Sequence, residues 1–309
     1  MTPAAARAFA KAGMTPDGAL VVSAAEFRRA VNVCRAHPKV AVLTAPGAGP
    51  AELGRALFPQ TPRSFVVCED LDGPDERVVH VRPAEATTRP WHDPQVVLVL
   101  DTRRAAGAPG WIEGAVPGPA GWAPPGFALA PEALAVVLAR LGPRLGDLVW
   151  DVGSGDGSVG IECARFGAAV IAVERDRARC EAIRENVRLH GVRAAVSRGE
   201  IPSVLDHLPD PDAVFTGTGG PAAAAACADR ALHRVVAVSA AGEAPDIAAD
   251  LARRGFAAGA VRLDATPLAP SGAPSAPTVI VWGERGARRP GRPVPPTRRG
   301  VETAGELPA

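Results

Sequence analysis

The sequence predicts an α/β fold, with a doubly wound and mostly parallel sheet in the second half of the chain and a smaller α/β region in the first half. Two observations support this prediction. Short apolar runs alternate with stretches of helical periodicity along both halves. In addition, a glycine-rich turn follows the apolar run 148–152, and the next run, 169–173, ends at Glu174. Parallel strands joined by helices bring such strand ends to one edge of the sheet, where these folds bind their ligands.

Glycine and proline divide the chain into domains. The length allows about two domains of ~150 residues. Apolar residues make up 47% and charged residues 22%, which is typical of a globular protein. The chain has 33 glycines and 32 prolines, and these two residue types are most frequent between residues 101 and 125 and after residue 285. We therefore expect a first domain at 1–101, a linker at 102–125, a second domain at 126–284 and a disordered tail at 285–309.

Charge and cysteine content exclude several classes of protein. The chain has 34 basic and 33 acidic residues, a net charge of +1, which argues against a nucleic-acid-binding protein and against a polybasic membrane protein. The five cysteines are far apart and form no pattern of zinc ligands, so no metal is expected. The first residues lack the pattern of a signal peptide, and no apolar run is long enough to span a membrane. These features predict a cytoplasmic protein with reduced thiols.

The first region should alternate strands and helices. Residues 26–35 place four apolar side chains on one helical face, at Phe27, Ala30, Val31 and Cys34. The largely apolar runs 64–69 and 96–100 are typical of strands that are buried on both faces of a sheet. A further strand is expected at residues 39–44 and a helix at 51–57, and residues 20–23 form a short apolar run.

The second region shows the stronger alternation of helices and strands. Helices are expected at residues 131–141, 158–165 and 176–190, with Gly191 ending the last of them. Strands are expected at residues 148–152, 169–173, 194–197, 213–216, 235–238, 257–263 and 278–282. Since no helical pattern separates the last two strands, we expect them to pair antiparallel.

The motif with chemical content is VWDVGSGDG at 149–157, followed 17 positions later by Glu174. Its glycines let the backbone approach a ligand, and the helix that follows presents free N–H groups. Glu174, at the end of the second strand, can accept hydrogen bonds from both hydroxyls of a ribose. The spacing is GxGxG, not the GxGxxG of dinucleotide folds, and the acidic Asp151 suits a cationic ligand. This pattern is typical of S-adenosylmethionine (SAM) sites, because the methionine end of SAM carries an ammonium and a sulfonium.

Two groups of site residues follow from this prediction. The cofactor-binding residues, which hold the methionine part, the ribose and the adenine edge of SAM, should be Asp151, Gly153, Ser154, Gly155, Gly157, Glu174 and Glu200. The acceptor should meet the methyl group at the end of the strand 213–216, which gives the substrate-binding residues Thr216, Gly217, Thr218, Gly219 and Gly220. A plain glycine turn with solvated acids is the alternative. Asn186 is expected to cap or pack within its own helix. The histidines are scattered, so no catalytic side chain is assigned.

The second region also resembles a known family. The matching segments are LGDLVWDVGSGDGSVGIECARFGAAVIAVERD, RENVRLHGV with Asn186, LPDPDAVFTGTGG at 208–220 and VIVWGE at 279–284. They resemble the decarboxylating precorrin methyltransferases of cobalamin biosynthesis, the CbiT-type domain. In the first region, NVCRAHPKVAVLTAPGAGPAELGRAL, VCEDLDGPDERVV and RPWHDPQVVLVLD resemble the second half of the CbiE-type methylase. Fusions of the two domains are similar to the precorrin-6Y C(5,15)-methyltransferases.

The resemblance implies a reaction and a substrate. It implies methyl transfer from SAM to carbon 15 of a precorrin-6 intermediate, with decarboxylation of the acetate on carbon 12. Orientation of the two reactants and exclusion of water would supply most of the rate, so no side-chain nucleophile is needed. The implied partner is a tetrapyrrole, and neither a nucleic acid nor a membrane is expected as a partner. A homo-oligomer is possible on this resemblance.

The chain also departs from the family pattern. The amino-terminal methylase of the family has a first half with its own glycine-rich loop, and this chain starts after it. We therefore expect no methylation at carbon 5 from the first region alone. A segment of the family that ends in Thr-Lys is replaced by PPGFALAP at 124–131, and a Gly-Asp pair reads Gly199-Glu200.

Two other functions remain open from the sequence. One is a methyltransferase for another small molecule or for RNA. The Asn/Asp-Pro-Pro-aromatic motif of amino-group methylases is missing, since residues 215–220 read FTGTGG, and the charge balance argues against RNA. The other is a catalytically weak SAM-binding or assembly subunit of the same pathway, which the missing half-domain favours.

Overall fold

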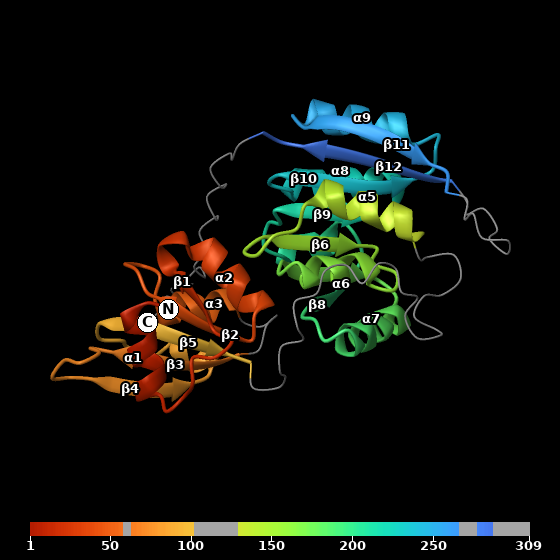
Figure 1. Cartoon of the computed structure of the whole chain (residues 1–309). Coiled ribbons are helices and arrows are strands. Elements are labelled where there is room, and N and C mark those ends of the chain that lie inside the picture. The colour runs from red at the N-terminus through yellow and green to blue at the C-terminus, as the bar shows by residue number, and fades with distance from the viewer. Residues whose placement is uncertain (58–62, 102–128, 266–276, 287–309) are drawn as a thin grey trace, which may run out of the picture.

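The computed structural model describes residues 1–57, 63–101, 129–265 and 277–286, and these form two sheets with their own helices (Figure 1). One sheet is built from residues 20–100 and the other from residues 148–284. The linker predicted at 102–125 lies outside the described residues, as does the predicted tail beyond residue 286.

The first sheet is mixed and has the strand order β1-β2-β5-β3-β4. Only β1 and β2 pair parallel, and the other three pairs are antiparallel. The strands are β1 (Leu20–Ser23), β2 (Lys39–Leu43), β3 (Ser64–Glu69), β4 (Arg77–Val81) and β5 (Pro94–Leu100). The inner strands β3 and β5 match the two largely apolar runs of the sequence.

Helices cover both faces of the first sheet, as the buried strands predict. On one face, Phe9 of α1 (Pro3–Lys11) packs with Ala41 and Leu98. On the other face, α2 (Phe27–Ala36) and α3 (Pro50–Leu57) pack on the alternate residues of the same strands. The short helices are η1 (Ala24–Glu26) and α4 (Pro83–Ala86).

The second sheet confirms the predicted doubly wound fold, with the order β11-β12-β10-β9-β6-β7-β8. Strands β6 to β10 run parallel, and β12 pairs antiparallel with both β10 and β11, as expected for the last two strands. The strands are β6 (Leu148–Val152), β7 (Ala169–Glu174), β8 (Ala195–Arg198), β9 (Ala213–Thr216), β10 (Arg234–Ser239), β11 (Ala257–Leu263) and β12 (Thr278–Glu284). Since β6 lies between β7 and β9, the turns after these three strands meet at one edge.

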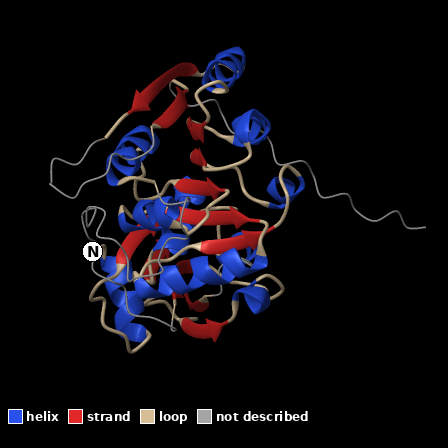
Figure 2. Ribbon diagram, turned by 90° about the vertical axis from the view of Figure 1, so that its right-hand side faces the viewer, coloured by secondary structure: helices blue, strands red, loops and turns tan. Residues whose placement is uncertain are grey.

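Helices also cover both faces of this sheet (Figure 2). The helices α5, α6 and α7 pack on one face, and α8 and α9 pack on the other. Their bounds are α5 (Pro131–Leu141), α6 (Ser158–Arg165), α7 (Arg177–Leu189), α8 (Gly220–Arg230) and α9 (Ala244–Arg253), with a 3-10 turn η2 (Ser203–His207). Among the helices of the described residues, none is long and apolar enough to span a membrane.

Candidate functional site

The glycine-rich turn joins the central strand β6 to α6. Its three glycines have φ angles of 66°, 60° and 83°, in the left-handed region that favours glycine. The Gly153 N–H donates to the Val173 carbonyl over 2.9 Å, which ties the turn to the end of β7. A Cβ at Gly153 would collide with the side chain of Thr218, so this position also needs glycine for space. The turn is therefore held tightly between the ends of β7 and β9.

Glu174, the last residue of β7, connects this turn to the start of α7. Its side chain is 5% exposed. One carboxylate oxygen accepts the N–H groups of Arg175 at 2.9 Å and Asp176 at 3.1 Å. The other oxygen accepts the N–H of Gly155 at 3.4 Å. Because a carboxylate has about four lone-pair sites, the second oxygen keeps capacity for a donor from a ligand.

Asp151 lies beneath the turn. Its side chain is fully buried, and one oxygen accepts the N–H of Gly160 in α6 over 2.9 Å. The other oxygen is buried without a hydrogen-bond partner. Burial raises the pKa of this carboxyl to about 7, against the opposing effect of the Gly160 N–H. Its carboxyl therefore faces α6, whereas the sequence predicts a contact with the methionine part of a cofactor.

Three polar side chains fix the backbone of the turn. The Ser154 hydroxyl donates to the Asp151 carbonyl, and the Asp156 carboxylate accepts the N–H of Ser158 at the start of α6. The Asn186 amide on α7 reaches across and donates to the Asp156 carbonyl over 2.8 Å. The expectation that Asn186 caps or packs within its own helix is therefore wrong. The available signal was a polar residue on the buried face of α7, three positions after Ile183.

The second turn of the site follows β9. Thr216 is buried, and the Gly217 N–H donates to the Val152 carbonyl over 2.9 Å, which joins this turn to the end of β6. Thr218 and Gly219 are exposed, Thr218 lies against Gly153 of the glycine-rich turn, and Gly220 begins α8.

A cavity of about 670 Å³ opens between these turns, a size typical of small-molecule sites. Of the predicted cofactor residues, it is lined by Gly153, Glu174 and Glu200, and of the predicted substrate residues by Thr218 and Gly219. The other predicted residues lie outside the lining: Asp151, Ser154, Gly155, Gly157, Thr216, Gly217 and Gly220.

Sequence reasoning missed the residues that complete the lining. These are Val173, Arg175, Arg179, Gly199, Ile201, Pro202, Ala222, Ala223 and Ala226. The guanidinium of Arg175 and the carboxylate of Glu200 are 3.9 Å apart, and both side chains are more than two thirds exposed. An ion pair this exposed contributes little stability. A ligand can therefore displace it at small cost.

The part of the cavity lining that the structure describes contains no histidine and no cysteine. Among the described residues, no group of three His, Cys, Asp or Glu side chains is placed to hold a metal ion. The five cysteines are buried and unpaired, and burial raises the pKa of the Cys34 and Cys227 thiols to about 12, so these two stay protonated at neutral pH. The arrangement is suited to binding and orienting ligands.

The fold defines the class of the second domain. The sheet order, the antiparallel β12 and the glycine-rich turn after β6 make it a Rossmann-like α/β domain. Residues 130–272 match the family model described as a precorrin methyltransferase domain, and this domain of the chain belongs to that family. The resemblance of the second region to this family is thereby confirmed.

Individual relatives agree with the family match. The chain is 35% identical over 193 residues to a precorrin-6Y C(5,15)-methyltransferase (decarboxylating) of Sinorhizobium sp., covering 60% of this chain and 46% of the relative. It is 38% identical over 94 residues to a probable cobalt-precorrin-6B C(15)-methyltransferase (decarboxylating) of Pyrobaculum calidifontis, covering 29% of this chain and 48% of the relative. The chain thus spans less than half the length of these curated relatives.

Among solved structures, the carboxy-terminal domain of precorrin-6Y C5,15-methyltransferase from Rhodobacter capsulatus is 32% identical. The match covers 52% of this chain and 92% of that structure, with a TM-score of 0.46.

Proposed function

We propose that the chain is a SAM-dependent methyltransferase of cobalamin biosynthesis. It methylates carbon 15 of a precorrin-6 intermediate and decarboxylates the acetate on carbon 12. The observation that carries this proposal is the cavity between Gly153, Glu174 and Thr218, which lies within a precorrin methyltransferase domain. The similarity to decarboxylating relatives supports the choice of substrate and of reaction.

The residues of the cavity fit SAM. Gly153 has no side chain at the point where the methionine part would approach the backbone, and a Cβ there would fill the space. Glu174 offers a buried carboxylate oxygen with spare acceptor capacity for the ribose hydroxyls. Ile201 and Pro202 give an apolar wall, with Glu200 beside it, where the adenine ring would lie. Asp151 acts from below the turn as a positioning residue, through Gly160.

SAM supplies a methyl group that its sulfonium has already activated, so this chain needs only to bind and orient the reactants. The turn after β9 places Thr218 and Gly219 at the edge of the cavity where the acceptor carbon must approach. Val173 and the alanines of α8 give this approach an apolar side. Fixing two reactants in this way accelerates a bimolecular step by a large effective molarity.

We infer that residues 1–101 alone do not methylate carbon 5. Their resemblance to the second half of a methylase domain supports this inference. We further infer a cytoplasmic protein that acts on a small molecule, without nucleic acid or membrane partners. The net charge of +1 and the five separate, unpaired cysteines support this inference. A homo-oligomer is compatible with the proposal.

The proposal is tested by incubating the chain with SAM and precorrin-6Y and following the mass of the tetrapyrrole. The expected product has gained one methyl group and lost one molecule of carbon dioxide. A gain of two methyl groups would contradict the assignment of carbon 15 alone. If SAM binds but the mass of the tetrapyrrole does not change, the catalytic function is wrong and the chain is a SAM-binding or assembly subunit.

A further inference from the structure

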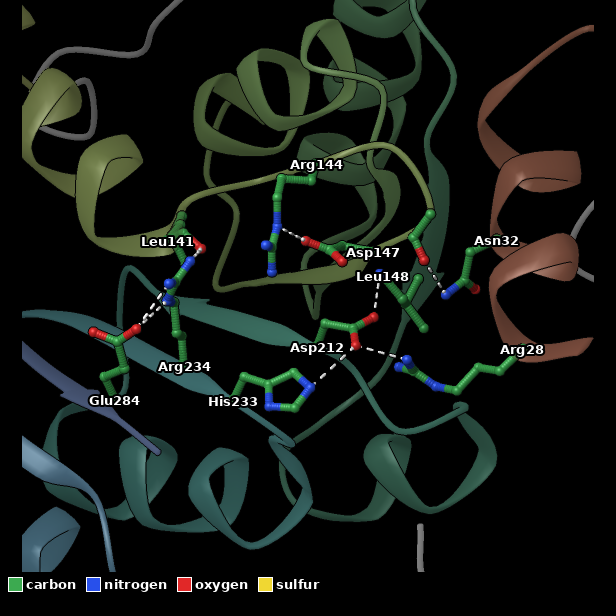
Figure 3. Close-up of polar contacts among 11 residues, drawn as sticks. Arg28, Asn32, Leu141, Arg144, Asp147, Leu148, Asp212, His233, Arg234 and Glu284 are labelled. Carbon is green, nitrogen blue, oxygen red and sulfur yellow. Dashed lines mark hydrogen bonds and ion pairs between the residues drawn. The ribbon is translucent and has the colours of Figure 1, made fainter. Parts of the chain in front are cut away.

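The two domains meet through specific polar contacts that no part of the proposed function uses. One guanidinium nitrogen of Arg28, on α2, lies 2.6 Å from a carboxylate oxygen of Asp212, and the other donates to the Asp210 carbonyl over 2.9 Å. One turn further along α2, the Asn32 amide donates to the Gly146 carbonyl over 3.0 Å, and this hydrogen bond is buried. Figure 3 shows both side chains pointing from α2 to the second domain.

The carboxylate of Asp212 makes contacts within its own domain and with the first domain. Its second oxygen accepts the N–H of Leu148, the first residue of β6, over 2.7 Å (Figure 3). Asp212 itself directly precedes β9, and its side chain is buried. Arg28 therefore contacts the residue that holds the amino ends of β6 and β9 together. This contact gives a structural role to Asp212, the second aspartate of the LPDPDAVF segment, which does not line the cavity.

A second contact lies at the end of β5. One oxygen of the Asp101 carboxylate lies 3.0 Å from a guanidinium nitrogen of Arg63 in the first domain and 3.1 Å from one of Arg193 in the second. All three side chains are buried or nearly so: Arg63 is 3% exposed, Asp101 10% and Arg193 13%. Such a buried carboxylate needs its partners, because an unpaired buried charge is strongly unfavourable.

The contacts and the cavity lie at opposite edges of the second sheet. Gly146, Arg193 and Asp212 precede the strands β6, β8 and β9, whereas the cavity is lined by residues at and after the carboxyl ends of these strands and of β7. In the described part of the chain, no lining residue comes from residues 1–101. The first domain therefore contacts the sheet that carries the site without touching the site.

We propose that the first domain is a structural support for the methyltransferase domain. Through Arg28, Asn32 and Asp101, it holds the amino edge of the second sheet in place and slows local opening there, and it contributes nothing to ligand binding at the opposite edge. This role does not depend on the identity of the ligand, and it assigns a function to residues 1–101.

The test compares two double variants of the full chain. Arg28→Ala with Arg193→Ala removes one partner from the Arg28–Asp212 pair and one from the Asp101–Arg193 pair, and it leaves the Asn32–Gly146 hydrogen bond in place. Arg55→Ala with Arg177→Ala is the control, because each of these arginines is exposed and pairs with a glutamate of its own helix. Hydrogen exchange followed by mass spectrometry reports on peptides that cover residues 146–149 and 210–214, and on the turn 153–157.

The expected result is faster exchange, by about tenfold or more, at the amino ends of β6 and β9 in the interdomain variant, with the control unchanged. Calorimetry with SAM should give affinities within about twofold for both variants, below their unfolding temperatures. Exchange at these peptides equal to that of the control would overturn the proposal. A loss of SAM affinity with unchanged exchange would also overturn it, since the first domain would then act on the site. The exchange result stands even if the chain binds no SAM.

A milder variant covers the case in which the double variant does not fold. Arg28→Gln keeps a polar side chain that can donate hydrogen bonds, but it is shorter and lacks the charge that faces Asp212. We expect a smaller increase of exchange at residues 146–149 and 210–214 than in the double variant. Exchange in this variant equal to wild type would overturn the role of Arg28.

Discussion

Two glycine-rich turns in this chain look alike in sequence and differ in structure. Residues 46–50 of the first domain join β2 to α3, and residues 153–157 of the second domain join β6 to α6. Both turns line cavities of similar volume, about 620 Å³ and about 670 Å³. Cavity size therefore does not separate them.

The difference lies in a second acidic residue. In the first turn, the Gly49 N–H donates over 3.1 Å to Glu52, which belongs to the helix that follows and also pairs with Arg55 on its surface. The second turn likewise has a local acid, Asp156, which accepts the N–H of Ser158. In addition it contacts Glu174, which comes from the neighbouring strand β7 and is buried. A local acid completes a turn, whereas the acid from the neighbouring strand places a carboxylate in the cavity wall. The comparison teaches that the glycines alone do not define a site.

The largest effect is expected from Gly153→Ala. A Cβ there meets Thr218, and the positive φ is unfavourable for alanine. We expect SAM affinity to fall by about 100-fold or more, as follows from a loss of ~3 kcal/mol. The matched control is Gly47→Ala, where φ is also positive but no atom lies within 4 Å of the new Cβ. Equilibrium dialysis with labelled SAM should show no change for the control, and equal losses in both variants would contradict the comparison.

The second prediction concerns the two acids. Glu174→Ala removes an acceptor for the ribose and for three backbone N–H groups. We expect SAM affinity to fall by about 10- to 100-fold, since a hydrogen bond to a charged group contributes ~1.5–3 kcal/mol. Glu52→Ala in the first turn should leave the affinity unchanged. Fluorescence titration with SAM measures both, and an affinity for Glu174→Ala equal to that of wild type would remove Glu174 from the site.

The third prediction follows from the carboxyl beneath the second turn. Because burial raises the pKa of Asp151 from 3.8 to about 7, the folded state binds a proton that the unfolded state has lost. The stability of the wild type should therefore fall as pH rises through this window and level off above it. Asp151→Asn should lack this fall. The free energy of unfolding of the variant minus that of the wild type should therefore rise by a few kcal/mol as pH rises through this window, on the order of the pKa shift. Urea unfolding at several pH values measures this, and a difference independent of pH would contradict it.

The smallest effect is expected at Asn186. Asn186→Ala leaves the buried Asp156 carbonyl without its partner, and we expect a loss of about 1–2 kcal/mol in the free energy of unfolding. Glu185→Ala, the exposed neighbour on α7, is the control and should change stability by less than about 0.5 kcal/mol. Chemical denaturation measures both. Equal stability of the two variants would mean that the hydrogen bond to the turn is not important.

The strands and helices around the second turn were predictable because their signals are local. Apolar runs and glycines give β6, α6 and β9 with the bounds seen in the structure, and the alternation gives the doubly wound sheet. Helices α1, α4, α8 and α9 and strand β4 were not predicted. In α8 most residues are alanine, which packs well in any element and leaves little periodicity, so tertiary packing decides its structure.

The site was only partly predictable for a related reason. Gly153 and Glu174 follow strands whose ends meet by the rules of parallel sheets, and both line the cavity. The direction of the Asp151 side chain, toward Gly160, is not encoded by spacing. Arg175 and Ile201 join the lining because of how the turns after β7 and β8 are placed. The pairing of Arg28 with Asp212 joins residues 184 positions apart, which no local pattern indicates.

Calorimetric titration of the full chain with SAM tests the central claim most directly, because it counts sites as well as measuring affinity. If only the second turn forms a cofactor site, the stoichiometry is one SAM per chain, and it stays at one in Gly47→Ala. Two molecules per chain, or no heat of binding in the wild type, would contradict the account.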